Sequence, residues 1–473
     1  MNARELLAGF DYRLFAGSAP LPADLSITDV ATEPGKVTKN TLYVATVTPM
    51  RDGHDGASSA YLHGCRLFLS ERGLTLPADA TVLVGEQVEA MAAVLCARAL
   101  GHPARSLTVF GVAGAHGKSS VVLLTAELLR RAGHKVGTLT TDGVQAGEHF
   151  TPADLIVPDA VEIQHILACF RDAGCEFAVL EFSAYQLEHG AASGIPFAAL
   201  LLTDTAPAHI GRGEFRREAD YFAAVGRLFA GQTPLTLLPA ADVPFAVHGH
   251  TVRFGPEGAL ICRAQGTVPY ACRFTLTFDG EEYTITHPVP GDVAMTNATA
   301  AAALSLAAGL PLSTVARLLG SLTVPGRMER IAPQVFLDTA YTGPDVARAL
   351  AALRRDTPGR LSVLVGAVGG RAKQRRAPLG AACAANADFV WFTTDDPDAE
   401  DPDAIFHDLI AGTDGAGRYR CIADRKAALL AAVGELRPGD ALLITGKGEQ
   451  TYQLIAGERV PFSDREIIKE AFR

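Results

Sequence analysis

The residues with the clearest chemical potential form the glycine-rich segment Gly111-Val-Ala-Gly-Ala-His-Gly-Lys118-Ser-Ser120. An apolar run of buried-strand length, residues 107–112, precedes it, and residues 119–132 carry apolar side chains at helical spacing. Backbone N–H groups in such a loop, at the positive end of a helix, can surround phosphate groups. We therefore expect Lys118 to reach the β- and γ-phosphates of a nucleotide and the Ser119 hydroxyl to hold Mg²⁺.

The loop departs from the usual GxxxxGK[ST] spacing, because Val112 stands where the first glycine belongs. A glycine-rich turn without a phosphate is therefore an alternative interpretation. The preceding strand and the following helix favour the phosphate loop, and the nucleotide contacts are expected from Gly114, Gly117, Lys118, Ser119 and Ser120.

A carboxylate is needed to complete a magnesium site, and Glu181 ends the next strand-like run, residues 177–181. Its position favours catalysis together with Lys118 and metal binding together with Ser119. A cap or a solvated residue at a strand end is the alternative for an isolated glutamate.

Composition limits the class of protein. The 473 residues are 48% hydrophobic and 20% charged, which is ordinary for a folded α/β chain of two to four domains. A net charge of −10 argues against a nucleic-acid partner. The first twenty residues contain charges between their apolar residues, and the eight cysteines form no CxxC pair, so we expect a cytoplasmic protein without a membrane segment.

Strand-like and helical segments alternate along the chain and predict three α/β domains. Residues 27–84 read as a small α/β module within a first domain, 1–105. Buried runs separated by helices predict a doubly wound parallel sheet in a central domain, 106–332. The same alternation, with strand-like runs at 361–365, 389–393 and 441–445, predicts a Rossmann-like third domain, 333–473.

Six ordered segments resemble the Mur ligase family, and within it the enzymes that add the third residue of the peptidoglycan peptide. They are Ala113-Gly-Ala-His-Gly-Lys-Ser-Ser120, Glu181-Phe-Ser-Ala-Tyr-Gln-Leu-Glu188, Val324-Pro-Gly-Arg-Met-Glu-Arg330, Asp395-Asp-Pro-Asp-Ala-Glu-Asp-Pro402, Gly446-Lys-Gly-Glu-Gln-Thr-Tyr-Gln453 and Pro461-Phe-Ser-Asp-Arg-Glu466. The resemblance implies a UDP-binding domain, a central P-loop ATPase domain and a domain for the incoming amino acid. It also implies ATP and Mg²⁺ as cofactors and a reaction in which a carboxylate becomes an acyl phosphate that an amine attacks.

The same resemblance assigns further contacts to numbered residues. Asn297 would face the adenine, Arg327 the nucleotide phosphates and Asp338 the ribose. Taken alone, Asn297 could be the N-cap of the alanine-rich segment that follows it, and the other two could be surface charges. The amino acid would be bound by Arg371, Asp395, Asp396, Asp398 and Glu449.

Several family positions are altered. The Thr-x-Asp-His motif becomes Thr203-Asp-Thr-Ala206, and Val225 stands where a carbamylated lysine would bridge two magnesium ions. His209 is a candidate catalytic residue that would substitute for the missing magnesium ligand, although a lone histidine is more often structural. The acceptor-binding segments are changed at Glu33-Pro-Gly35 and Ile156-Val-Pro158.

Asp398 replaces the arginine with which diaminopimelate-specific members grip a distal carboxylate. A carboxylate would instead favour the distal ammonium of lysine or ornithine, unless it merely faces solvent. We expect an ATP-dependent amide ligase acting on UDP-muramoyl-dipeptide or, as a paralogue, on another carboxylate in secondary metabolism. A non-catalytic nucleotide-binding protein is a rival from a different class. For each of these functions we expect the partners to be small molecules and the chain to be a monomer or homodimer.

Overall fold

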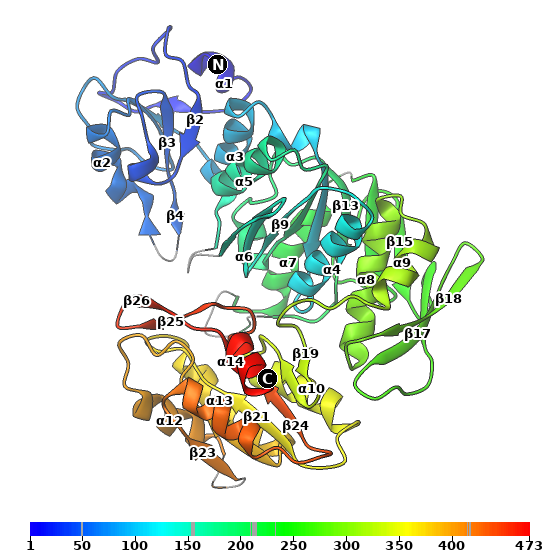
Figure 1. Ribbon diagram of the computed structural model, residues 1–473. Coiled ribbons are helices and arrows are strands. Elements are labelled where there is room, and N and C mark those ends of the chain that lie inside the picture. Colours follow the sequence, from blue (N-terminus) through cyan, green and yellow to red (C-terminus); the bar gives the residue numbers. More distant parts are fainter. Residues whose placement is uncertain are drawn as a thin grey trace. The chain divides into compact units, whose positions relative to one another are not determined.

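The structure, a computed structural model, describes residues 1–48, 51–152, 157–208, 210, 215–231, 233–413, 415 and 418–473 (Figure 1). The chain divides into two compact units. The first comprises Met1–Cys262, Thr277–Glu281 and Thr299–Val315, and the second comprises Arg263–Leu276, Glu282–Ala298 and Ala316–Arg473. The predicted α/β class is confirmed, whereas the three domain boundaries stay a prediction. No helix in the described part of the chain is long and apolar enough to span a bilayer.

The amino-terminal part of the first unit contains a five-stranded sheet in the order β1-β7-β6-β3-β2. Its strands are β1 (Arg13–Leu14), β2 (Asp29–Ala31), β3 (Thr41–Ala45), β6 (Leu67–Ser70) and β7 (Thr81–Val84), accompanied by α1 (Ala3–Leu6), α2 (Ala57–Leu62), α3 (Val88–Ala99) and the short pair β4 (Val47–Thr48) and β5 (Arg51–Asp52). Neighbouring side chains of β3 enter two different cores, Leu42 and Val44 in one and Tyr43 and Ala45 in the other. The sheet is therefore buried on both faces.

The second sheet of this unit carries the phosphate loop (Figure 1). Nine of the eleven strands of this sheet run in the order β11-β10-β9-β12-β8-β13-β14-β15-β16. They are β8 (Thr108–Ala113), β9 (Val136–Thr140), β10 (Gly143–Ala146), β11 (His149–Pro152), β12 (Phe177–Glu181), β13 (Phe197–Leu202), β14 (Leu235–Pro239), β15 (Thr251–Gly255) and β16 (Leu260–Ala264). Strand β8 pairs in parallel with both β12 and β13, so the residues that follow these three strands meet at one edge.

Helices α4 (Lys118–Arg131), α5 (Ala160–Asp172), α6 (Ala184–Glu188) and α7 (Glu218–Phe229) accompany this sheet. The sequence sets their starts. Helix α5 begins at a capping box in which Asp159 accepts from Val161 and Glu162 N–H groups. Helix α4 begins directly after Gly117, whose φ of 78° is left-handed and suits glycine.

The second unit contains a six-stranded sheet in the order β19-β20-β24-β21-β22-β23. Its strands are β19 (Glu329–Ala332), β20 (Val335–Leu337), β21 (Leu361–Val365), β22 (Phe389–Phe392), β23 (Tyr419–Cys421) and β24 (Ala441–Ile444), with helices α10 (Gly343–Arg354), α11 (Arg376–Asn386), α12 (Pro402–Ala411), α13 (Arg425–Gly434) and α14 (Asp464–Ala471). All strands except β19 pair in parallel. Strands β21, β22 and β24 match the three predicted strands at 361–365, 389–393 and 441–445 to within one residue.

Further elements are β17 (Cys272–Phe278), β18 (Glu281–His287), α8 (Asp292–Ala307), α9 (Leu312–Leu319) and the antiparallel hairpin β25 (Tyr452–Ile455) with β26 (Glu458–Pro461). Asn297 lies inside α8, five residues after its first residue Asp292. The interpretation of Asn297 as an N-cap is wrong, because the helix begins earlier than its alanine-rich part.

Candidate active site

The loop between β8 and α4 has a backbone that requires glycine at two positions, Gly114 and Gly117, both of which have a positive φ. Gly114 has a φ of 136°, and a Cβ there would lie 2.1 Å from the Thr203 hydroxyl oxygen. Any side chain would therefore force the loop away from the end of β13. The Thr203 hydroxyl also donates to the His116 carbonyl at 2.7 Å and fixes the loop from the same side.

Ser119, Glu181 and Thr141 bring their oxygen atoms together beside this loop. The Ser119 hydroxyl donates to Glu181 Oε2 at 2.7 Å and lies 3.2 Å from the Thr141 hydroxyl. The backbone N–H of Thr141 also donates to Glu181 Oε2, at 3.2 Å. Glu181 is only 5% exposed, so the alternative of a solvated strand-end residue is wrong.

Lys118 reaches the same carboxylate from the first turn of α4. Its ammonium lies 3.9 Å from Glu181 Oε1 and donates to the Ala115 carbonyl at 3.2 Å. The structure thus brings together Lys118, Ser119 and Glu181, the three residues on which the sequence interpretation depends. Parallel pairing explains this, because Glu181 lies opposite Val112 in the register of β12 and β8.

This cluster has the chemistry of a magnesium site. Two hydroxyl oxygens and one carboxylate are hard oxygen donors of the kind that Mg²⁺ prefers, and the ion retains waters and substrate phosphates as its other ligands. The residues that would hold it are Ser119 and Glu181, with Thr141 beside them. Thr141 was missed in the sequence, where only its place directly after a strand-like run, 136–140, could have pointed to it.

Asp204, also missed, bonds to the phosphate loop itself. Its carboxylate accepts from the backbone N–H of His116 at 2.7 Å and from that of Ala115 at 3.3 Å. A third N–H, from Ala206, donates at 3.0 Å. Burial alone would raise the pKa of Asp204, but the bonds from His116 lower it overall, so the carboxylate is charged at neutral pH.

The positions that depart from the family pattern differ in burial, and not all of them lie among the described residues. Val225 is 2% exposed and packs in the core beneath α7, where it offers no metal ligand. Ala206 is half-buried and likewise offers none. His209 and Ile156 lie outside the described residues, so the expected role of His209 stays a prediction.

In the second unit, most of the residues that are predicted to bind the substrate amino acid follow the carboxyl ends of β22 and β24. Lys447, which is fully buried, lies 2.7 Å from Asp396 Oδ1 and 3.3 Å from Asp395 Oδ1. Burial raises the pKa of Asp395, and Lys447 opposes that shift. Asp396 also accepts the N–H of Leu454 at 2.9 Å. Both carboxylates therefore have partners within the protein, and they share the one positive charge of Lys447.

Asp398 and Glu449 are bound by the protein as well. Asp398 has a φ of 51°, and its Oδ1 accepts the N–H of Gly457 at 2.7 Å, which holds the turn of the β25–β26 hairpin. The alternative in which Asp398 merely faces solvent is therefore wrong. Glu449 accepts from Arg465 Nε at 2.9 Å, and the same guanidinium also binds Glu329 at 2.8 Å.

Arg371 behaves differently from these acids. Its side chain is exposed and pairs with no carboxylate in the described part of the chain. Arg375, also exposed, lies over the Tyr341 ring at 5.6 Å from its centre. Both arginines follow the carboxyl end of β21, at the edge where ligands bind parallel sheets.

Asn297, Arg327 and Asp338, which the resemblance places at the adenine, the nucleotide phosphates and the ribose, all lie in the second unit. Asp338 accepts the N–H groups of Met328 and Ala340, both at 2.7 Å, and burial raises its pKa. Arg327 bonds to the Thr339 hydroxyl. Both side chains are bonded within the protein, so the alternative in which they are surface charges is wrong. Their roles in nucleotide binding stay predictions.

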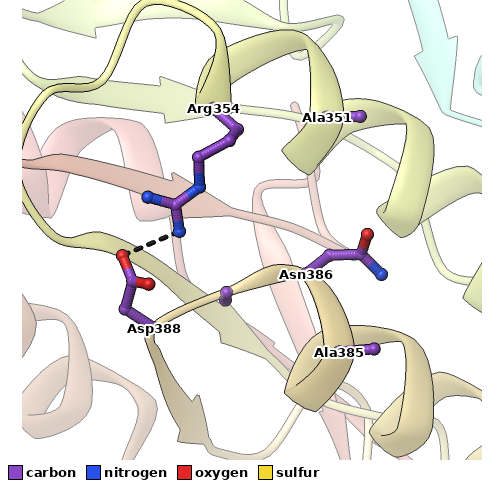
Figure 2. A pocket seen from close by; sticks show the side chains of 6 residues that line it. Ala351, Arg354, Ala385, Asn386 and Asp388 are labelled. Carbon is purple, nitrogen blue, oxygen red and sulfur yellow. Dashed lines mark hydrogen bonds and ion pairs between the residues drawn. The ribbon is translucent and has the colours of Figure 1, made fainter.

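A pocket of about 450 Å³ lies elsewhere in the second unit, between the ends of α10 and α11. Figure 2 shows Arg354 extended towards Asp388, to which it is bonded at 2.7 Å, with Ala351, Ala385 and Asn386 around them. Asp388 precedes β22, so the pocket lies at the amino end of the strand. Because ligands of parallel sheets bind at the opposite edge, we do not assign it to the active site.

Comparison with known proteins decides the family. The Mur ligase middle domain matches residues 112–305, and the Mur ligase glutamate ligase domain matches residues 326–448. The UDP-N-acetylmuramoyl-L-alanyl-D-glutamate–2,6-diaminopimelate ligase of Geobacillus thermodenitrificans is 30% identical over 441 residues, which are 89% of this chain and 90% of that protein. The chain belongs to the Mur ligase family. The enzyme of the same name from Chlorobaculum tepidum is 31% identical over 94% of this chain and 92% of its own length.

Solved structures agree on the fold of this Mur ligase. A diaminopimelate ligase structure superposes with a TM-score of 0.70 at 22% identity and covers 100% of this chain and 98% of that chain. MurF from Thermotoga maritima in complex with ADP gives a TM-score of 0.59 at 18% identity, with 95% and 98% covered. The predicted three-domain Mur ligase architecture is confirmed. The chain is an ATP-dependent ligase of the type that joins a carboxylic acid to an amine.

Proposed function

We propose that this Mur ligase joins an amino acid to UDP-muramoyl-dipeptide, or to a closely similar carboxylate, by way of an acyl phosphate and with MgATP as the phosphoryl donor. The observation that supports this most is the approach of Lys118 and Ser119 to the buried carboxylate of Glu181. Phosphoryl transfer requires mainly positioning and charge neutralisation, which such a cluster provides.

In the first step, an oxygen of the acceptor carboxylate attacks the γ-phosphorus of ATP, and the bond to the β-phosphate oxygen breaks to release ADP. Lys118 would neutralise the charge that grows on the transferred group, and the loop N–H groups would orient it. Mg²⁺, when bound, supplies further charge neutralisation and would be held by Ser119 and Glu181. In the second step the amine attacks the acyl carbon, phosphate leaves, and the amine loses a proton. We propose His209 as a catalytic residue that substitutes for the magnesium ligand missing at position 225.

The charges of the second unit favour an amino acid that carries a distal carboxylate. Asp395 and Asp396 are bonded to Lys447, and Asp398 accepts the N–H of Gly457, so each of these acids already has a partner within the protein. Arg371 and Arg375 are exposed, and neither pairs with a carboxylate in the described part of the chain. A guanidinium matches a carboxylate with two parallel hydrogen bonds. The amino acid is therefore of the diaminopimelate class that the relatives' names give, rather than lysine or ornithine.

Two other functions rest on specific residues. The altered segments Glu33-Pro-Gly35 and Ile156-Val-Pro158 favour a paralogue that acts on another carboxylate in secondary metabolism. Val225 and Ala206, which offer no metal ligand, are the ground for the alternative of a non-catalytic nucleotide-binding protein; the relatives' names instead favour a ligase. In either case the proposed partners are small molecules, the location is the cytoplasm, and the chain is a monomer or homodimer.

Phosphate release from MgATP distinguishes these functions. We expect release to require both UDP-muramoyl-dipeptide and diaminopimelate, and we expect Lys118→Ala to abolish it. Release with other carboxylates but not with this dipeptide would support the paralogue. Nucleotide binding without release for any pair of carboxylate and amine would support the non-catalytic function.

A further inference from the structure

The bonds of Asp204 to the phosphate loop bear on how nucleotide enters. A backbone N–H group has one hydrogen to donate, and those of Ala115 and His116 are donated to Asp204. In a loop of this kind, such N–H groups are the donors that surround phosphate oxygens. The carboxylate of Asp204 thus occupies part of the loop's donor set.

The charge of Asp204 adds to this occupation. Its pKa is lowered overall by the bonds from His116 although burial opposes the shift, so a negative charge stays against the loop at neutral pH. A triphosphate brought to the same N–H groups would lie within a few ångströms of that charge and be repelled. The end of β13 holds Asp204 in place, because Thr203 beside it is bonded to the His116 carbonyl.

We propose that Asp204 is an internal competitor for nucleotide: its carboxylate holds the phosphate loop in shape when the loop is empty and leaves the N–H groups of Ala115 and His116 when the phosphates bind. This rests on the proposed function of the loop. The bonds from the loop to Asp204 preorganise the loop, and the same bonds weaken its affinity for nucleotide. Asp204 is therefore a positioning residue that sets how tightly MgATP and MgADP bind.

The test is the dissociation constant of MgADP and MgATP, measured by calorimetry on the full chain, for wild type and Asp204→Asn. Asparagine keeps the size and one acceptor oxygen but removes the charge. We expect both nucleotides to bind about tenfold tighter to the variant, because like-charge repulsion is removed. Adenosine, which has no phosphate, should bind the two proteins equally.

The matched control is Asp142→Asn, which removes the same charge from the turn after β9. We expect it to change nucleotide affinity less than twofold. Asp204→Asn binding no tighter than wild type would overturn the proposal. Amide hydrogen exchange at Ala115 and His116 gives a second measurement. MgADP should slow their exchange more in the variant than in wild type, because Asp204 already protects these N–H groups in wild type, and equal changes would count against the proposal.

The outcomes separate this proposal from the proposed function. If wild type binds MgATP and releases phosphate with its substrates while Asp204→Asn is not tighter, only the competitor role fails. If neither protein binds nucleotide in a Lys118-dependent way, the phosphate loop itself is refuted, and the competitor role with it.

Discussion

Asp464→Asn should destabilise the second unit strongly, because it breaks an ion pair that is sealed from water. Asp464 and Arg425 both have fully buried side chains, and their two bonds measure 2.8 and 2.6 Å. Burial would lower the pKa of Arg425, and Asp464 raises it overall in the wild type. Without Asp464 the guanidinium still keeps its charge, because arginine is not deprotonated in proteins. Removing one partner therefore leaves an uncompensated buried charge.

The magnitude follows from what remains around the guanidinium. Arg425 keeps its bonds to the carbonyls of Thr394 at 3.0 Å and Thr445 at 3.2 Å. Losing one member of a buried pair usually reduces stability by about 3–5 kcal/mol. Because two acceptors remain, we expect the lower end, about 3 kcal/mol. This is a large part of the stability of an ordinary domain.

The chain offers a direct assay, since its one tryptophan, Trp391, is fully buried in the second unit. Urea unfolding followed by the fluorescence of Trp391 reports this unit's free energy of unfolding. The control is Arg354→Gln, which breaks an exposed pair with Asp388 and should change that free energy by less than about 1 kcal/mol. If Asp464→Asn were as mild as the control, the argument from burial would be refuted.

Three further predictions concern the loop, the amino acid and pH. Gly114→Ala should weaken MgATP binding more than about tenfold by calorimetry, because an alanine there is strained by 1–3 kcal/mol; unchanged affinity would contradict the loop geometry. Replacing Arg371 or Arg375 by alanine should raise the KM for diaminopimelate and leave the KM for ATP unchanged, and an equal effect on both would exclude the proposed carboxylate contact. The hydrogen bond to Asp29 raises the pKa of His165, so its stabilising contribution is complete below the unfolded pKa of about 6.5 and is lost as pH rises through the folded value. Because the pair is partly exposed, the loss should stay below about 1 kcal/mol. Hydrogen exchange in residues 160–172 should accelerate from pH 6 to 8 more in wild type than in His165→Gln, after correction for intrinsic rates; identical pH dependence would contradict it.

Local signals in the sequence predicted much of the site. The apolar run 107–112 matches β8 to within one residue, and the glycine-rich loop with Lys118 and Ser119 follows it as expected. Glu181 was found because it ends a strand-like run, and parallel strands place such ends at one edge. These inferences needed only strand length, helix spacing and the rule for parallel sheets.

Contacts between distant segments could not be predicted in this way. Asp204 reaches the loop across 88 and 89 positions of sequence, which depends on β13 lying next to β8. Thr141 joins the cluster through its hydroxyl and through its backbone N–H, and the second of these contacts is one that residue type does not indicate. The sequence predicted that Asp398 selects the charge of the substrate, which stays a prediction; it did not indicate that the Asp398 carboxylate also holds a hairpin turn that begins more than fifty residues later.

The magnesium dependence of phosphate release tests most directly whether Lys118, Ser119 and Glu181 act on one nucleotide. We predict that Glu181→Gln raises the Mg²⁺ concentration needed for half-maximal release by about tenfold or more and lowers kcat, while the circular dichroism and the thermal unfolding of the whole chain stay those of wild type. A Glu181→Gln protein with the wild-type magnesium requirement and kcat would contradict the account.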